Sequence, residues 1–136
     1  MTTEYTLRAA VFLAERAGAS FTAHEIARET QVPADYLSKI MRDLCRANLV
    51  ISRPGRNGGY ALMVDAKSIS LLDVVQAVEP IRQIDNCPLG RPCHAKELCP
   101  LHRAIGSAIS DFVNRLSGTT LGSLCPIQLI PVGGIQ

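Results

Sequence analysis

The sequence is poor in aromatic residues and has no long apolar run. It holds no Trp, three Phe and three Tyr in 136 residues. No apolar stretch approaches the roughly 20 residues that cross a bilayer, and no basic head followed by an apolar stretch opens the chain. We therefore expect a cytoplasmic protein that does not bind membranes. Because 47% of the residues are hydrophobic, there is still ample material for a core, which excludes a disordered chain.

The usual marks of an enzyme site are also missing. The sequence has no C-x-x-C pair, no Gly-rich phosphate loop and no recognisable set of nucleophile, base and orienting residue. We predict that the protein is not an enzyme. Internal repeats and low-complexity segments are absent too, so a solenoid is excluded.

The formal net charge of only +2 hides an uneven distribution. Between residues 36 and 60, five cationic side chains face one carboxylate, a local charge of +4: Lys39, Arg42, Arg46, Arg53 and Arg56 against Asp43. A basic patch of this kind is the electrostatic footprint of a nucleic-acid-binding surface.

The basic patch coincides with a predicted helix-turn-helix. Thr22 and Glu25 form a capping-box pattern at the start of a short helix. A turn at Gln31 leads to Pro33, which suits the first position of the next helix. That helix has one apolar face, at Leu37, Ile40, Met41 and Leu44. Two short helices with so brief a turn between them are typical of this motif.

A predicted β-hairpin follows. Apolar residues 49–51 and 60–62 flank a turn rich in Gly and Asn at 53–59. A helix-turn-helix followed by a hairpin makes a winged helix. The third helix then leaves Ser38, Lys39, Arg42 and Arg46 facing outward, where they could enter a major groove of double-stranded DNA, and the wing adds Arg53, Arg56 and Asn57.

The remaining pattern is helical. A first helix is predicted from Thr2 or Thr3 to Gly18, and another from the cap at Ser70 to Pro80. Pro100 starts a long helix whose apolar stripe reaches residue 116 and needs a partner helix, which indicates a homodimer. We thus expect a mostly α fold: a winged helix-turn-helix domain at 1–80, then a cysteine-rich loop and dimerisation helix at 81–136, with a loose tail from 126.

Three of the five cysteines lie close together. Cys87, Cys93 and Cys99 are each separated by five intervening residues within an irregular Pro-rich loop, and His102 follows one helical turn after the last. Zinc sites more often use two-residue gaps, whereas iron–sulfur clusters accept varied spacing and a histidine ligand. We favour an iron–sulfur cluster over zinc, and over thiols that are redox-active or inert. His94 is a weaker candidate ligand, and we expect Cys45 and Cys125 to be dispensable for the cluster.

Taken together, these motifs resemble the bacterial iron–sulfur regulators typified by IscR, NsrR and RirA, the Rrf2 family. The resemblance covers nearly the whole chain and rests on the order of five features: residues 36–40, the wing at 58–60, residues 69–75, the three-cysteine loop, and the end of the long helix at 120–122. It implies a homodimeric transcription factor, in which the cluster held by Cys87, Cys93 and Cys99 changes the affinity for DNA when it is lost, oxidised or nitrosylated.

The resemblance allows two fourth ligands. His102 matches the IscR type, which implies a 2Fe-2S cluster that reports cluster supply, and this is the version we favour. Glu4 is placed like the acidic residue that NsrR-type members supply from the other subunit, which implies a 4Fe-4S cluster that reports nitric oxide or iron. The sequence departs from the family at Pro54, where the wing commonly has an arginine, and in a first helix that begins almost at Met1.

The function predicted from the sequence is therefore a repressor, or a dual regulator, of transcription on a roughly palindromic operator. It is gated by an iron–sulfur cluster that senses cluster supply, iron, redox state or nitric oxide. The alternative is a winged-helix regulator with structural zinc or no metal that senses through thiol oxidation.

Overall fold

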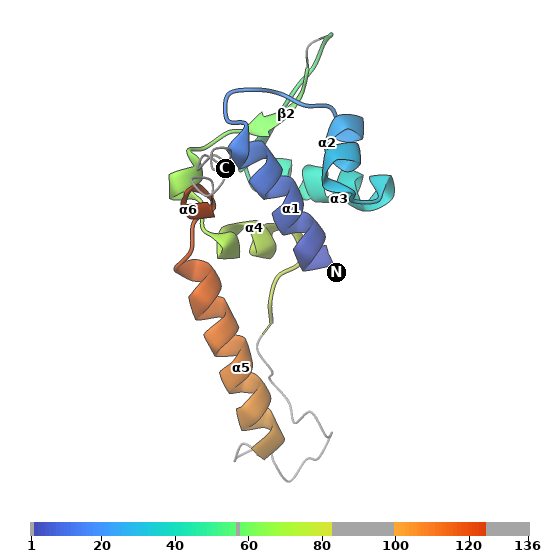
Figure 1. The fold of residues 1–136 in the computed structure, drawn as a ribbon. Coiled ribbons are helices and arrows are strands. Elements are labelled where there is room, and N and C mark those ends of the chain that lie inside the picture. The colour runs from blue at the N-terminus through green and yellow to red at the C-terminus, as the bar shows by residue number, and fades with distance from the viewer. Residues whose placement is uncertain (1, 57, 83–99, 125–136) are drawn as a thin grey trace, which may run out of the picture.

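The computed structural model describes residues 2–56, 58–82 and 100–124. The helices are α1 (Thr2–Glu15), α2 (Ala23–Thr30), α3 (Ala34–Arg46), α4 (Leu71–Val78), α5 (Pro100–Ser117) and α6 (Leu121–Leu124). A hairpin of β1 (Val50–Arg53) and β2 (Gly59–Leu62) follows α3, and a 3-10 turn, η1 (Ala66–Ser68), precedes α4. The mostly α winged helix-turn-helix predicted from the sequence is confirmed (Figure 1).

The helix-turn-helix forms because local signals agree with the tertiary packing. The backbone N–H of Glu25 donates to Thr22 Oγ1 at 3.1 Å, and that of Thr22 donates to Glu25 Oε1 at 2.8 Å, which completes the predicted capping box. Gln31 ends α2 in the left-handed conformation, with φ of 58°, at the point where a turn glycine is frequent. Pro33 caps α3 rather than occupying its first turn, a shift of one residue.

The core lies where α1, α2, α3 and α4 meet under the hairpin. The predicted apolar face of α3 is buried there, at Leu37, Ile40, Met41 and Leu44. The same cluster holds residues from α1, α2, α4 and α6, among them Leu13, Ile26, Val74 and Leu121. Burial of one face of α3 fixes its outer face toward solvent.

The wing is a two-stranded antiparallel hairpin in which Val50 pairs with Leu62 and Arg53 pairs with Gly59. An isolated bridge joins its second strand to the segment before α2, between Phe21 and Tyr60. In Figure 1 the hairpin projects from one end of the molecule, beside α2 and α3.

The long helix α5 projects from the opposite end (Figure 1). Leu116, near its C-terminus, is its one buried residue. After α5 the chain returns to the body, because Ser70 forms a bridge with Thr120 and Leu121 is completely buried. The expected domain boundary between residues 80 and 81 stays a prediction.

The first helix stops at Glu15, followed by a turn at 16–18, so it is slightly shorter than the predicted helix to Gly18. Among the residues that the structure describes, no helix has the length and apolar character needed to cross a membrane. The tail from 126, expected to be loose, lies outside the described ranges.

Candidate nucleic-acid interface

The outer face of α3 carries the polar side chains expected there. Ser38, Lys39, Arg42 and Arg46 are all exposed, whereas Leu37 and Ile40 on the opposite face are completely buried. The arrangement follows from helical periodicity, because residues three and four apart share a face. Their contact with DNA remains a prediction.

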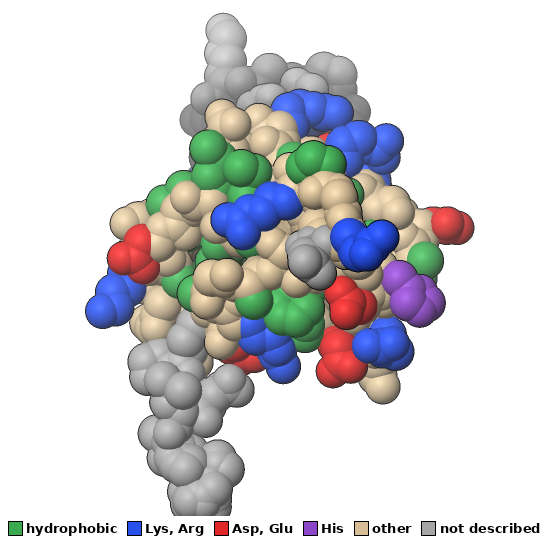
Figure 2. All heavy atoms as spheres, turned by 90° about the horizontal axis from the view of Figure 1, so that it is seen from above, with side chains coloured by type: hydrophobic (Ala, Val, Ile, Leu, Met, Phe, Trp, Pro, Cys, Tyr) green, Lys and Arg blue, Asp and Glu red, His purple; other side chains and the backbone are tan. Residues whose placement is uncertain are grey.

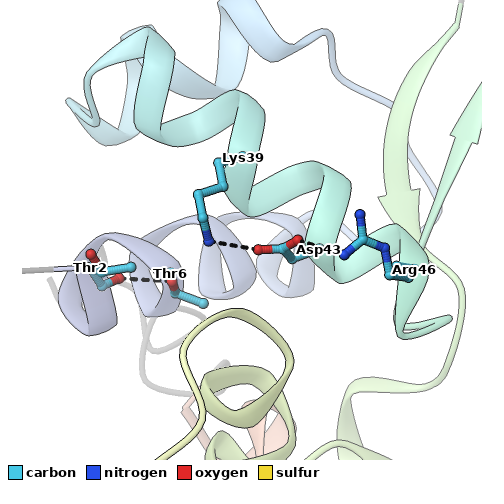
Figure 3. A network of polar contacts seen from close by, with 5 residues as sticks. All are labelled: Thr2, Thr6, Lys39, Asp43 and Arg46. Carbon is cyan, nitrogen blue, oxygen red and sulfur yellow. Dashed lines mark hydrogen bonds and ion pairs between the residues drawn. The ribbon is translucent and has the colours of Figure 1, made fainter.

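Asp43 organises two of these cations. Lys39 Nζ lies 2.9 Å from Asp43 Oδ2, and Arg46 Nη1 lies 3.5 Å from Asp43 Oδ1 (Figure 3). The Asp43 side chain is only 12% exposed, so its carboxylate is held close to the helix surface between the two cations. We did not predict this pairing, although the spacings of four and three residues were a signal for it.

Arg42 differs from its neighbours. Among the described residues it takes part in no ion pair, and its side chain is exposed between Lys39 and Arg46 on the same face. An unpaired guanidinium is available to meet a phosphate or a guanine edge without first breaking an internal contact. Arg42 is therefore the strongest single candidate on α3.

The wing contributes two further exposed cations. Arg53, the last residue of β1, places Nη1 3.4 Å from Ser20 Oγ, and Arg56 lies in the turn. Pro54, at the place of the family arginine, is exposed between them. Asn57 lies outside the described residues. Seen from the wing end, Lys and Arg side chains are spread over the face in mostly separate positions (Figure 2).

Cys87, Cys93 and Cys99 lie outside the described residues, as do His94 and Cys125. Within the described ranges, no group of three or more His, Cys, Asp or Glu side chains could hold a metal ion. The donor set itself, three thiols and an imidazole, has the chemistry that suits an iron–sulfur cluster.

The two candidate fourth ligands occupy different parts of the molecule. His102 lies half-buried in the first turn of α5, directly after the cysteine segment. Glu4 is exposed on α1, where Arg8 Nη2 lies 3.5 Å from its carboxylate. The start of α1 and the start of α5 are well separated within one chain (Figure 1), so the two side chains do not converge on one site there.

Cys45 has the character expected of a small apolar residue. It lies on α3, is partly buried against the core and forms no disulfide. Burial raises the pKa of its thiol above the usual value of 9.0, so the thiol is protonated at neutral pH. A protonated thiol is a poor nucleophile, and this position is a poor redox sensor.

Comparison with known proteins identifies the family. Residues 1–126 match the Rrf2 model, described as an iron-dependent transcriptional regulator. The chain belongs to the Rrf2 family. It is therefore a transcriptional regulator, and the prediction that it is not an enzyme is confirmed. Rrf2 regulators bind DNA, which agrees with the exposed cations of α3 and the wing.

Solved structures of Rrf2 proteins share the fold. CymR, the global cysteine regulator of B. subtilis, is 25% identical with a TM-score of 0.71, and the alignment covers 94% of this chain and 95% of CymR. The oxidized form of Staphylococcus aureus CymR is 27% identical with a TM-score of 0.70, over 92% and 93%. IscR of T. potens, at 21% identity and a TM-score of 0.73 over 91% and 82%, shows the fold alone.

Proposed function

We propose that this Rrf2 regulator is a cytoplasmic, homodimeric repressor that binds a roughly palindromic operator. Its affinity for the operator is gated by an iron–sulfur cluster. The observation that carries DNA recognition is the outer face of α3, where Arg42 is exposed without an ion pair among the described residues, beside a wing that bears Arg53 and Arg56. Such a helix can enter a major groove while the wing reaches the adjacent backbone.

The dimer is proposed to form through α5. One side of this helix is an open apolar surface, lined by Ala104, Ile105, Ala108, Ile109 and Phe112. Phe112 is 45% exposed and Leu101 is 38% exposed in the single chain. A second copy of α5 would cover this face, and the resulting twofold axis would place two α3 helices on successive half-sites of the operator.

The cluster is proposed to be held by Cys87, Cys93 and Cys99 with His102 as fourth ligand, in the 2Fe-2S form. A bound cluster supplies iron that reacts with oxidants and nitric oxide. His102 lies at the start of α5, so ligation would fix the cysteine segment against the proposed dimer helix. The alternative is a 4Fe-4S cluster with Glu4 of the other subunit.

DNA recognition is tested by a salt titration of duplex binding. The double variant Arg42→Ala/Arg56→Ala is expected to bind more weakly. It should also flatten the dependence of log K on log salt by up to about 3.6, since the dimer loses up to four phosphate contacts and each lowers the slope by about 0.9. The control is Arg82→Ala/Arg115→Ala, which removes the same charge away from α3 and the wing. Equal behaviour of the two variants would refute the proposed surface.

The cluster is tested by anaerobic purification, with visible and resonance Raman spectra. A brown protein whose spectrum changes in His102→Ala but not in Glu4→Ala supports the favoured ligand set, and the reverse supports Glu4. Cys93→Ser is expected to lose the colour, whereas the matched variant Cys45→Ser keeps it. A colourless protein that contains zinc would contradict the cluster.

Gating is a separate claim with its own measurement. A shift of operator occupancy from 1:99 to 99:1 requires about 5.5 kcal/mol of differential binding between the cluster-bound and cluster-free proteins. Equal affinity of both forms for one operator would rule out gating while leaving DNA binding intact.

A second candidate mechanism is oxidation of the loop thiols without any metal. It is favoured by the likeness to S. aureus CymR, of which an oxidized form has been solved. Two thiols would form one disulfide while a peroxide takes up two electrons and two protons and is reduced to water. A metal-free protein whose operator binding changes with peroxide and is restored by dithiothreitol would support it.

A further inference from the structure

A groove separate from the proposed DNA and dimer surfaces lies beside α6. It has a volume of about 590 Å³ and is bordered by the end of α1, the segment after β2, η1 and α6. Small residues leave this space open: Ala14, Ala17, Gly18, Ala66 and Gly122. Leu62, the last residue of β2, adds a larger apolar side chain to the lining.

The groove has an apolar rim that nothing covers within the described part of the chain. Met63 is 55% exposed and Val64 is 38% exposed, and both line the groove. Met63 is held in place, because its backbone N–H donates to the Leu49 carbonyl at 2.9 Å. Two consecutive exposed apolar side chains on a fixed backbone beside a groove form a candidate surface for another apolar group.

The residues that come after α6 in the sequence are mostly apolar and follow directly on a helix that borders the groove. Helix α6 ends at Leu124, two residues after Gly122 of the groove lining. The next twelve residues, CPIQLIPVGGIQ, contain no charged side chain and five branched aliphatic ones, at Ile127, Leu129, Ile130, Val132 and Ile135. At about 3.3 Å per residue they reach roughly 40 Å, far enough to fold back over the groove.

Helix α6, which leads into this segment, packs closely against one wall of the groove. A Cβ added at Gly122 would lie 2.7 Å from Lys67 Cγ and 3.0 Å from Lys67 Cα, so α6 and η1 touch at the backbone. Leu124, the last described residue, therefore lies only two residues beyond the groove lining. A tethered segment has an effective concentration near millimolar, which favours it over a second copy or a free ligand.

We propose that residues 126–136 bind in this groove and cover Met63 and Val64 with their aliphatic side chains. Asp65 and Lys67, which also line the groove, would border the bound segment with polar groups. Because residues 62–64 continue β2, the bound segment would lie against the strand that carries the wing. The proposal does not depend on the cluster or on the operator.

Oxidation of Met63 by hydrogen peroxide, followed by mass spectrometry of the full-length protein, tests the proposal. In the variant Leu129→Asp/Ile130→Asp we expect Met63 to oxidise at least threefold faster than in the wild type, because a charged segment leaves the groove. The control Gln128→Asp/Gln136→Asp adds the same charge at polar positions and is expected to match the wild type. Met41, which is completely buried, is the internal reporter of unfolding.

Equal rates of Met63 oxidation in the wild type and the aspartate variant would overturn the proposal, whether the groove is open or filled by another molecule. Protection that persists in the variant and rises with protein concentration would assign the groove to a second copy instead. If Met41 also becomes reactive, the variant is unfolding, and amide hydrogen exchange of the wild type then tests whether residues 126–136 are bound. Slow exchange in residues 126–136 supports binding, and exchange at the rate of an unstructured peptide refutes it.

Discussion

Phe21 and Tyr60 exchange two backbone hydrogen bonds. The N–H of Tyr60 donates to the Phe21 carbonyl at 2.7 Å, and the N–H of Phe21 donates to the Tyr60 carbonyl at 3.0 Å. Phe21 immediately precedes the cap of α2, and Tyr60 lies in the second strand of the wing. This pair therefore sets the position of the wing relative to the helix-turn-helix.

Gly59 is the residue that permits this pairing. Its φ is +136°, and a Cβ there would collide with the Phe21 carbonyl. We predict that Gly59→Ala lowers the free energy of unfolding by about 1–3 kcal/mol, because strain and collision act together, and weakens operator binding. Urea unfolding and a binding titration measure the two effects.

Gly55→Ala is the matched control for this prediction. Gly55 also has a positive φ, +102°, but a Cβ there would meet nothing within 4 Å. The substitution Gly55→Ala therefore adds backbone strain without a steric collision. A loss of stability as large as that of Gly59→Ala would show that the contact with Phe21 does not matter.

The sequence predicts local structure well here because the signals are local. The capping boxes at Thr22 and Ser70 and the apolar face of α3 each depend on residues at most one or two helical turns apart. The bond between Phe21 and Tyr60 joins residues 39 positions apart in a single bridge, and no periodic pattern marks it. Such contacts are decided by the packing of the whole domain.

The candidate DNA surface shows the same division. Exposure of Ser38, Lys39 and Arg42 follows from the helical period and was predicted from it. The ion pairs of Asp43 with Lys39 and Arg46 depend on the rotamers that these side chains adopt on the helix. A count of charges in the sequence does not distinguish these two cations from Arg42. The structure thereby distinguishes Arg42 from its two neighbours.

Asp43→Asn tests this distinction. We predict stronger binding to non-specific duplex DNA, with a salt slope steeper by about 0.9 for each phosphate contact that Lys39 or Arg46 gains, because the carboxylate no longer holds either cation. A fluorescence titration at several salt concentrations measures the slope. Asp35→Asn is the control, since it removes the same charge from the first turn of α3. If both variants change the slope equally, net charge alone is responsible.

The capping box of α2 predicts a dependence of stability on pH. The hydrogen bond from the backbone N–H of Thr22 holds the pKa of Glu25 below its usual value of 4.5. A carboxyl whose pKa is lower in the folded state adds stability above its unfolded pKa, and this contribution is lost as the pH falls through the folded value. The ionised form of Glu25 thus stabilises the protein at neutral pH.

Glu25→Gln isolates this charge because glutamine can still close a capping box. We predict that the variant is less stable than the wild type at pH 7. The difference should shrink when urea unfolding is repeated at pH values that fall below the usual Glu value of 4.5 and through the lower folded value, where the wild-type carboxyl becomes protonated. Glu29→Gln removes a carboxylate from the last turn of α2, away from the cap, and serves as control. A difference that stays constant with pH would contradict the prediction.

Leu121 joins the end of α5 to the winged-helix core. Its side chain is completely buried in the cluster of α1, α3 and α4, and its backbone N–H donates to the Ile69 carbonyl at 2.9 Å. We predict that Leu121→Ala lowers the free energy of unfolding by about 2–5 kcal/mol, as cavities in well-packed cores do. Leu124→Ala, three residues on and only partly buried, is expected to cost less. Urea unfolding followed by circular dichroism gives both values, and equal losses would mean that α6 is anchored elsewhere than at Leu121.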